Sequence, residues 1–116
     1  MTILGIYSNK GGVGKTATSV NLSYIAAQTG AKTLLCDLDP QGSATYYFRI
    51  KPKLKSGAKE FIKGGIQVHE NIKGTDYENL DLLPADFSLR NLDVAFNKFG
   101  SPKKRLKKIL SIFKDE

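Results

Sequence analysis

A glycine-rich run near the start of the chain constrains the fold more than any other feature. The segment Ile3 to Tyr7 is apolar and strand-like, and Lys10 to Thr16 reads Lys-Gly-Gly-Val-Gly-Lys-Thr. Lys15 to Gln28 has the pattern of a helix, and Thr33 to Leu38 is a second apolar strand. We therefore expect a βαβ unit, in which a right-handed crossover places the carboxyl ends of two parallel strands at one edge of a sheet.

The glycine-rich run has the chemistry of a phosphate-binding loop. Glycines let the backbone wrap closely enough for its N–H groups to point at phosphate oxygens, and the helix that follows adds its positive end. Lys15 supplies a mobile charge, and the Thr16 hydroxyl could ligate a magnesium ion that bridges terminal phosphates. The strict pattern would require glycine at position 9, where this chain has Asn9, and it does not call for Lys10.

The rest of the chain continues the alternation of strands and helices. Ser56 could cap a short helix that ends at Gly64, and Leu80 to Leu83 reads as a third strand, whereas residues 66–79 stay ambiguous. Asp86 looks like the cap of a helix that runs to Gly100. Ser101 and Pro102 then open a last helix, in which Leu106, Ile109, Leu110 and Phe113 share one face and lysines take the other.

Three motifs resemble those of one family. Lys10 to Thr16 is similar to the deviant Walker loop of the ParA/MinD family, and Leu35 to Thr45 (Leu-Cys-Asp-Leu-Asp-Pro-Gln-Gly-Ser-Ala-Thr) resembles the first switch of its partition branch. Asn79 to Ala85 looks like its third strand. The resemblance implies an α/β fold with the parallel sheet of a P-loop NTPase, flanked by helices, and residues 1–116 would be the N-terminal part of the ATP-binding domain.

The resemblance also implies site residues for ATP and Mg²⁺. Lys15 would hold the β- and γ-phosphates, Thr16 the magnesium, and Asp39 would position the attacking water. Asp37 would contact magnesium through its water shell, and Lys10 would reach the phosphates of a partner subunit. The residues that would surround the phosphates are Gly11, Gly12, Val13, Gly14, Lys15, Thr16 and Ala17.

Each side chain also has a simpler interpretation. A lone loop lysine such as Lys10 is usually solvated, and Asp39 could merely cap the turn that follows it. His69 has no ligand-spaced partners, so we assign it no role. Tyr46 and Tyr47 are expected to pack.

Composition limits the other functions. Lys+Arg 18 against Asp+Glu 11 gives +7, and two basic stretches, from Arg49 to Lys63 and from Lys103 to Lys108, are either solvated faces or contact surfaces for polyanions. A single cysteine, Cys36, excludes an iron–sulfur reductase like the nitrogenase iron protein and predicts a buried strand thiol. No apolar run is long enough to span a membrane, so we expect a cytoplasmic protein.

The leading hypothesis is a partition ATPase that forms an ATP-dependent homodimer, binds DNA non-specifically and meets a partition partner protein. A membrane-associated regulator of the MinD type is an alternative, since the basic last helix could lie on acidic lipid, although we expect its apolar face to pack on the sheet. A nucleotide-binding fragment without activity is another.

The family pattern would continue beyond Glu116 into the Walker B strand. We therefore expect a truncated form with weak or absent ATP hydrolysis. In the family that strand separates the phosphate-loop strand from the switch strand, so self-association through strand edges and the apolar faces around Leu34 and Leu82 is predicted.

Overall fold

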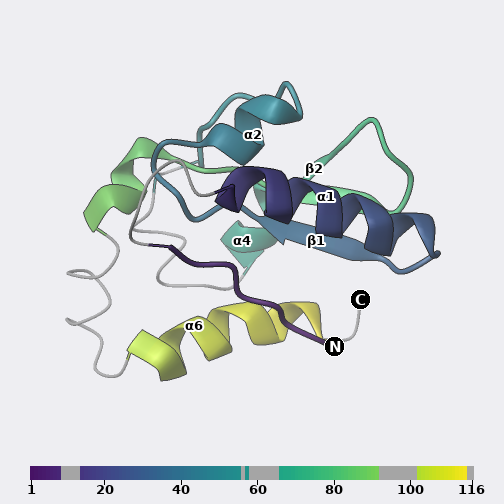
Figure 1. Ribbon diagram of the computed structural model, residues 1–116. Coiled ribbons are helices and arrows are strands. Elements are labelled where there is room, and N and C mark those ends of the chain that lie inside the picture. The colour runs from purple at the N-terminus through teal and green to yellow at the C-terminus, as the bar shows by residue number, and fades with distance from the viewer. Residues whose placement is uncertain (9–13, 56, 58–65, 92–101, 115–116) are drawn as a thin grey trace.

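The structure is a computed structural model that describes residues 1–8, 14–55, 57, 66–91 and 102–114. Helices α1, α2, α4 and α6 and strands β1, β2 and β3 are labelled or traced in Figure 1. In chain order the elements are α1 (Lys15–Gln28), β1 (Thr33–Cys36), α2 (Ser43–Tyr47), α4 (Ile66–Glu70), β2 (Lys73–Gly74), β3 (Leu80–Leu83), a 3₁₀ helix (Phe87–Asn91), α6 (Pro102–Leu110) and a second 3₁₀ helix (Ser111–Phe113).

The strands form one sheet in the order β1-β3-β2. β1 and β3 are parallel, with Thr33 opposite Leu80 and Cys36 opposite Leu83, whereas β2 runs antiparallel to β3. The sequence predicted the β3 strand at its observed bounds. The parallel pair brings the segments after Cys36 and Leu83 to the same edge of the sheet, which is where an α/β protein builds its site.

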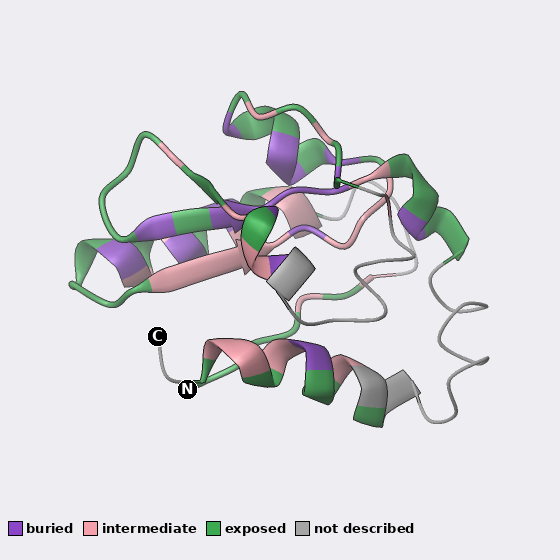
Figure 2. Ribbon diagram, turned by 180° about the vertical axis from the view of Figure 1, so that it is seen from behind, coloured by how far each residue is buried: buried purple, intermediate pink, exposed green. Residues whose placement is uncertain are grey.

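Helices cover both faces of this sheet, because successive side chains of a strand point to opposite sides. On one face, the apolar cluster joins α1, α2 and the sheet through Val20, Ala27, Ala44, Phe48, Leu80 and Leu82. On the other face, the cluster contains Leu54, Val68, Leu83, Ala85, Leu89 and Ile109, so it joins α4 and α6 to the sheet. Figure 2 shows α6 with its less exposed side turned toward the rest of the molecule.

The predicted first strand is wrong. Residues 1–8 have no regular secondary structure, and Ile3, Leu4 and Tyr7 are exposed. A strand requires a neighbour with free N–H and C=O groups, and no described strand pairs with this segment. The βαβ unit is therefore reduced to α1 followed by β1. The expectation of an apolar association face around Leu82 is also wrong, because this side chain is buried beneath α1.

Other expectations are confirmed or corrected in detail. α1 has the expected bounds, and the helix expected after Ser101 is α6. The second strand ends at Cys36, two residues early, and a 3₁₀ turn follows Asp86 where a helix was expected. The remainder of that helix, 92–100, and nearly all of the helix predicted between Ser56 and Gly64 lie outside the described residues.

Candidate nucleotide site at the start of helix α1

The amino end of α1 carries backbone donors that suit an anion. Gly14 precedes the helix with φ 85°, a left-handed conformation that glycine adopts without strain. The Thr18 N–H donates to the Gly14 carbonyl at 2.9 Å, as the first bond of the helix. The N–H groups of Lys15, Thr16 and Ala17 therefore have no partner within the helix, and within the described residues no side chain caps them. Together with the helix dipole, these three donors favour a phosphate.

Lys15 meets Asp39 across this end of the helix. Its Nζ lies 2.9 Å from Asp39 Oδ2, and the two side chains are 33% and 30% exposed. The hydrogen bond from Lys15 lowers the pKa of Asp39, and a second bond from the Gln41 N–H lowers it further, whereas partial burial acts in the opposite direction. The segments 8–16 and 39–45 were expected to be neighbours, and the contact between Lys15 and Asp39 confirms this although residues 1–8 form no strand. The contact places a cation and a carboxylate where ligand and water can reach them.

Asp37, two residues earlier, lies in a different environment. It is only 6% exposed, and its Oδ2 accepts from both the N–H and the hydroxyl of Thr45, at 2.9 and 2.6 Å. Its Oδ1 accepts one longer bond, 3.2 Å, from the Asp39 N–H. The Thr45 hydroxyl also accepts from the Ala85 N–H at 2.9 Å. This buried network ties the segment after β1 to the segment after β3.

Gly42 closes the turn between Asp39 and α2. Its φ of 68° is left-handed, and a Cβ there would lie 3.1 Å from the Cβ of Pro52 and 3.5 Å from that of Ala85. Glycine at this position therefore allows both the left-handed backbone and the close approach of Pro52 and Ala85. With Thr45 fully buried, the amino half of α2 is held against the end of β3. Asp39 is thus presented toward Lys15 by a fixed support.

The structure places only part of the predicted site. Lys15, Thr16 and Ala17 lie at the first turn of α1, and Asp37 and Asp39 lie on the segment after β1. Lys10, Gly11, Gly12 and Val13 lie outside the described residues. Sequence reasoning assigned no role to Thr45, which appeared only as the last residue of the switch motif. Its hydroxyl donates to Asp37 and helps to hold that carboxylate in place.

A magnesium ion fits the donors present. Mg²⁺ prefers oxygen ligands, keeps several waters and usually binds through one or two protein oxygens together with substrate phosphates. Thr16 lies in the first turn of α1, and Asp37 Oδ1 has a lone pair left for a bound water. Within the described residues no group of three or more His, Cys, Asp or Glu could hold a metal ion by itself, so a phosphate-bridged ion matches these residues better than a protein-only centre.

The remaining sequence candidates lie away from this site. The His69 ring packs against that of Phe113 at 5.1 Å, between α4 and the last 3₁₀ helix. Cys36 lies on β1 against the α6-side cluster, and burial raises its pKa to about 11. No helix within the described residues is long and apolar enough to cross a membrane.

Comparison with known proteins places all of residues 1–116 in a family whose model is described as an AAA domain. The sporulation initiation inhibitor protein Soj of Bacillus subtilis is 39% identical over 97% of this chain and 45% of its own length. The chromosome partitioning protein ParA of Caulobacter vibrioides is 31% identical over 95% of this chain and 42% of its own.

A solved structure shares the fold. Cobyrinic acid a,c-diamide synthase from Mycobacterium smegmatis, crystallised with an ATP analog and magnesium, superposes with a TM-score of 0.80 and 30% identity, over 92% of this chain and 44% of that one. The chain therefore spans less than half the length of each of these three proteins.

Proposed function

Because this chain belongs to the AAA-domain family of ParA- and Soj-like partition ATPases, we propose that it binds ATP with magnesium at the amino end of α1. The observation that carries the proposal is the Lys15–Asp39 contact at 2.9 Å. It brings the positive end of a helix, a mobile cation and a solvent-accessible carboxylate to one point. Phosphoryl transfer depends on positioning and charge neutralisation, which is what this set of groups supplies.

The described residues have distinct roles in this proposal. The free N–H groups of the first turn and the Lys15 ammonium hold the β- and γ-phosphates, and Thr16 provides a hydroxyl oxygen for magnesium. When Lys15 turns to the phosphates, Asp39 is released to orient a water. Asp37 would contact a bound magnesium ion through a water. That ion would neutralise part of the phosphate charge.

Hydrolysis, dimerisation and DNA binding extend the proposal beyond nucleotide binding at α1. We propose that Lys10 neutralises phosphate charge on a second copy, so that ATP favours a homodimer. Non-specific DNA binding and a partition partner protein complete this proposed role, and the net charge of +7 supports attraction to DNA. Lys10→Ala, in a chain of the relatives' length, should keep ATP binding and lose hydrolysis by roughly 10³- to 10⁵-fold, as for fingers supplied in trans. Normal hydrolysis would remove Lys10 from this role.

Contact with a membrane is not supported as the function of α6. Its residues Leu106 and Ile109 pack into the cluster on the sheet, and Ile109 is fully buried. An amphipathic helix that lies on lipid must offer its apolar face to the bilayer. Among the α6 side chains that the structure describes, the exposed ones are Lys104, Lys107 and Lys108.

The test of the proposed function is a titration with a fluorescent ATP analogue and magnesium. A hydrogen bond to a charged group contributes about 1.5–3 kcal/mol, so Lys15→Ala should weaken binding at least about tenfold. Lys107→Ala removes the same charge from an exposed position on α6 and should leave the affinity unchanged. Equal affinities for wild type and Lys15→Ala would overturn the assignment.

A further inference from the structure

Helix α2 carries a side chain that joins the two segments behind the candidate nucleotide site. Thr45 is the third residue of α2 and is fully buried. Its hydroxyl oxygen lies 2.6 Å from Asp37 Oδ2 and 2.9 Å from the backbone nitrogen of Ala85. Asp37 comes directly after β1, and Ala85 comes shortly after β3. Thr45 therefore connects the carboxyl ends of the two parallel strands.

The direction of the Thr45 O–H bond follows from its two partners. A hydroxyl has one proton to donate and can also accept hydrogen bonds. Because a backbone N–H only donates, the Thr45 oxygen accepts from Ala85, and its proton is left for the Asp37 carboxylate. The bond from Ala85 also polarises the hydroxyl and strengthens the bond that the hydroxyl donates. This chain of buried hydrogen bonds holds the Asp37 carboxylate in one orientation.

The two carboxylate oxygens of Asp37 differ in the capacity that they have left. Oδ2 accepts from both the N–H and the hydroxyl of Thr45, at 2.9 and 2.6 Å, which uses its two lone pairs. Oδ1 accepts one longer bond from the Asp39 N–H, at 3.2 Å. Oδ1 is therefore the oxygen that can accept from a water of a magnesium ion, and Thr45 decides that it is this oxygen.

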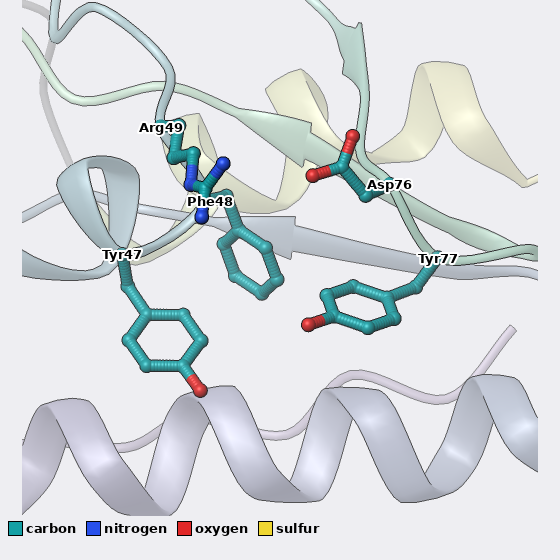
Figure 3. Close-up of a pocket in the computed structure, with 5 residues that line it drawn as sticks. All are labelled: Tyr47, Phe48, Arg49, Asp76 and Tyr77. Carbon is teal, nitrogen blue, oxygen red and sulfur yellow. The ribbon is translucent and has the colours of Figure 1, made fainter.

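Aromatic contacts fix the carboxyl end of α2. Phe48, the cap residue of this helix, is buried and packs edge-on against Tyr77 at 6.1 Å and against Tyr47 at 5.4 Å (Figure 3). Edge-to-face geometry is a favoured arrangement of aromatic rings. Since Gly42 is held at the amino end of the helix, α2 supports Thr45 from both sides.

The burial of Thr45 accompanies a correction to a sequence-based expectation. Tyr46 and Tyr47 were expected to pack, yet they are 64% and 61% exposed. The turns of α2 direct Ala44, Thr45 and Phe48 inward, which leaves the two tyrosines on the outer side of a short helix. A hydroxyl on the inward side must be hydrogen-bonded to offset the loss of its water contacts, and Thr45 meets this requirement at Asp37 and Ala85.

We propose that Thr45 is a positioning residue for magnesium-dependent nucleotide binding. It holds Asp37 Oδ2 and leaves Oδ1 for the water of the ion. Valine has the shape of threonine without the hydroxyl, so Thr45→Val removes one bond to Oδ2 and leaves the Ala85 N–H without its acceptor. The carboxylate then loses its fixed orientation. The inference rests on the proposed function, because Asp37 has this task only if ATP and magnesium bind at α1.

The experiment measures binding of a fluorescent, non-hydrolysable ATP analogue to the full chain, once with magnesium and once with EDTA instead. The readout is the factor by which magnesium strengthens binding of the analogue. By linkage, the chain strengthens binding of magnesium to the analogue by the same factor. A variant that is merely less stable loses affinity for the analogue under both conditions and keeps this factor.

Thr45→Val should lower the factor about tenfold, the smaller end of what loss of an outer-shell partner costs in metal affinity. Thr45→Ser keeps the hydroxyl and should keep the factor. In the background of Asp37→Asn, Thr45→Val should have little further effect, because both changes act through the same carboxylate. Thr75→Val is the matched control, since the Thr75 hydroxyl donates to the Leu80 carbonyl at 2.7 Å at the opposite end of β3. Its factor should equal that of wild type.

The outcomes separate this inference from the proposed function. An unchanged factor in Thr45→Val, or an equal loss in Thr75→Val, would overturn the role of Thr45 while nucleotide binding stands. A wild-type chain that binds no analogue would overturn the proposed function, and this inference with it.

Amide NMR of the wild-type chain decides the matter if Thr45→Val does not fold. The amides of Thr45 and Ala85 both donate into the network around Asp37. Magnesium added to the chain saturated with analogue should shift these two amides and leave that of Thr75 in place. Unshifted Thr45 and Ala85 amides would overturn the proposal.

Discussion

Asp39→Ala should tighten nucleotide binding by this chain. In the structure the Asp39 carboxylate engages the Lys15 ammonium at 2.9 Å, so a phosphate must displace it before it can bind that cation. Removing the carboxylate leaves Lys15 free and also removes a negative charge that repels the ligand. The expected effect is therefore opposite in sign to that of Lys15→Ala.

The exposure of the pair sets the magnitude. Two unit charges about 3 Å apart would attract by about 5 kcal/mol at an effective dielectric constant of 20. The Lys15 and Asp39 side chains are 33% and 30% exposed, so solvent screens the pair, and exposed ion pairs contribute about 0.2–1 kcal/mol when measured. The ATP analogue should consequently bind up to about fivefold more tightly to Asp39→Ala, because 1.4 kcal/mol corresponds to a factor of ten.

The assay is the fluorescent ATP titration with magnesium, carried out at low and high salt. Asp81→Ala removes the same charge from an exposed position on β3 and serves as the control for general electrostatics. The gain from Asp39→Ala should exceed that from Asp81→Ala, and it should shrink in the background of Lys15→Ala. Weaker binding by Asp39→Ala, or an equal gain in both backgrounds, would refute the idea that Asp39 competes with phosphate for Lys15.

Three further predictions concern the fold around the site. Thr45→Val removes the hydroxyl that donates to the buried Asp37 and accepts from the Ala85 N–H, although the backbone N–H of residue 45 stays, and should lower the free energy of unfolding by about 1–3 kcal/mol in urea titrations, with Thr45→Ser close to wild type. The Cys36 thiol, half-buried and with its pKa raised to about 11, should react with a thiol reagent at pH 7 more slowly than a free cysteine, because less of it is thiolate; labelling at the rate of free cysteine would contradict this. The lowered pKa of Asp39 stabilises the fold above about pH 4, its unfolded pKa, and this contribution is lost as pH falls through the folded pKa, so the midpoint in urea of Asp39→Asn should depend less on pH between 2 and 5.

Local patterns in the sequence predicted the elements that depend on local interactions. α1 lies between Gly14 and Gly30 and holds residues that favour a helix, and β3 is a run closed by Pro84. The strand expected at Ile3 to Tyr7 failed because strand formation requires a paired neighbour, which hydrophobicity does not report. β2, which consists of Lys73 and Gly74, has too few residues to produce a pattern.

The sequence predicted one contact of the candidate site and missed another. The meeting of Lys15 and Asp39 was expected from the rule that parallel strands end at one edge, and the structure confirms the contact although the first of those two strands does not form. The partnership of Asp37 with Thr45 depends on how α2 folds back over the end of β3, so no spacing rule reveals it.

The central claim is that ATP binds at the first turn of α1, and amide NMR with a non-hydrolysable ATP analogue and magnesium tests it most directly. The account predicts that the largest shifts occur at the amides of Lys15, Thr16 and Ala17, with a smaller shift at Asp39 as Lys15 leaves it. Shifts that are absent from these four amides at saturating ligand, or that centre on another part of the chain, would contradict it.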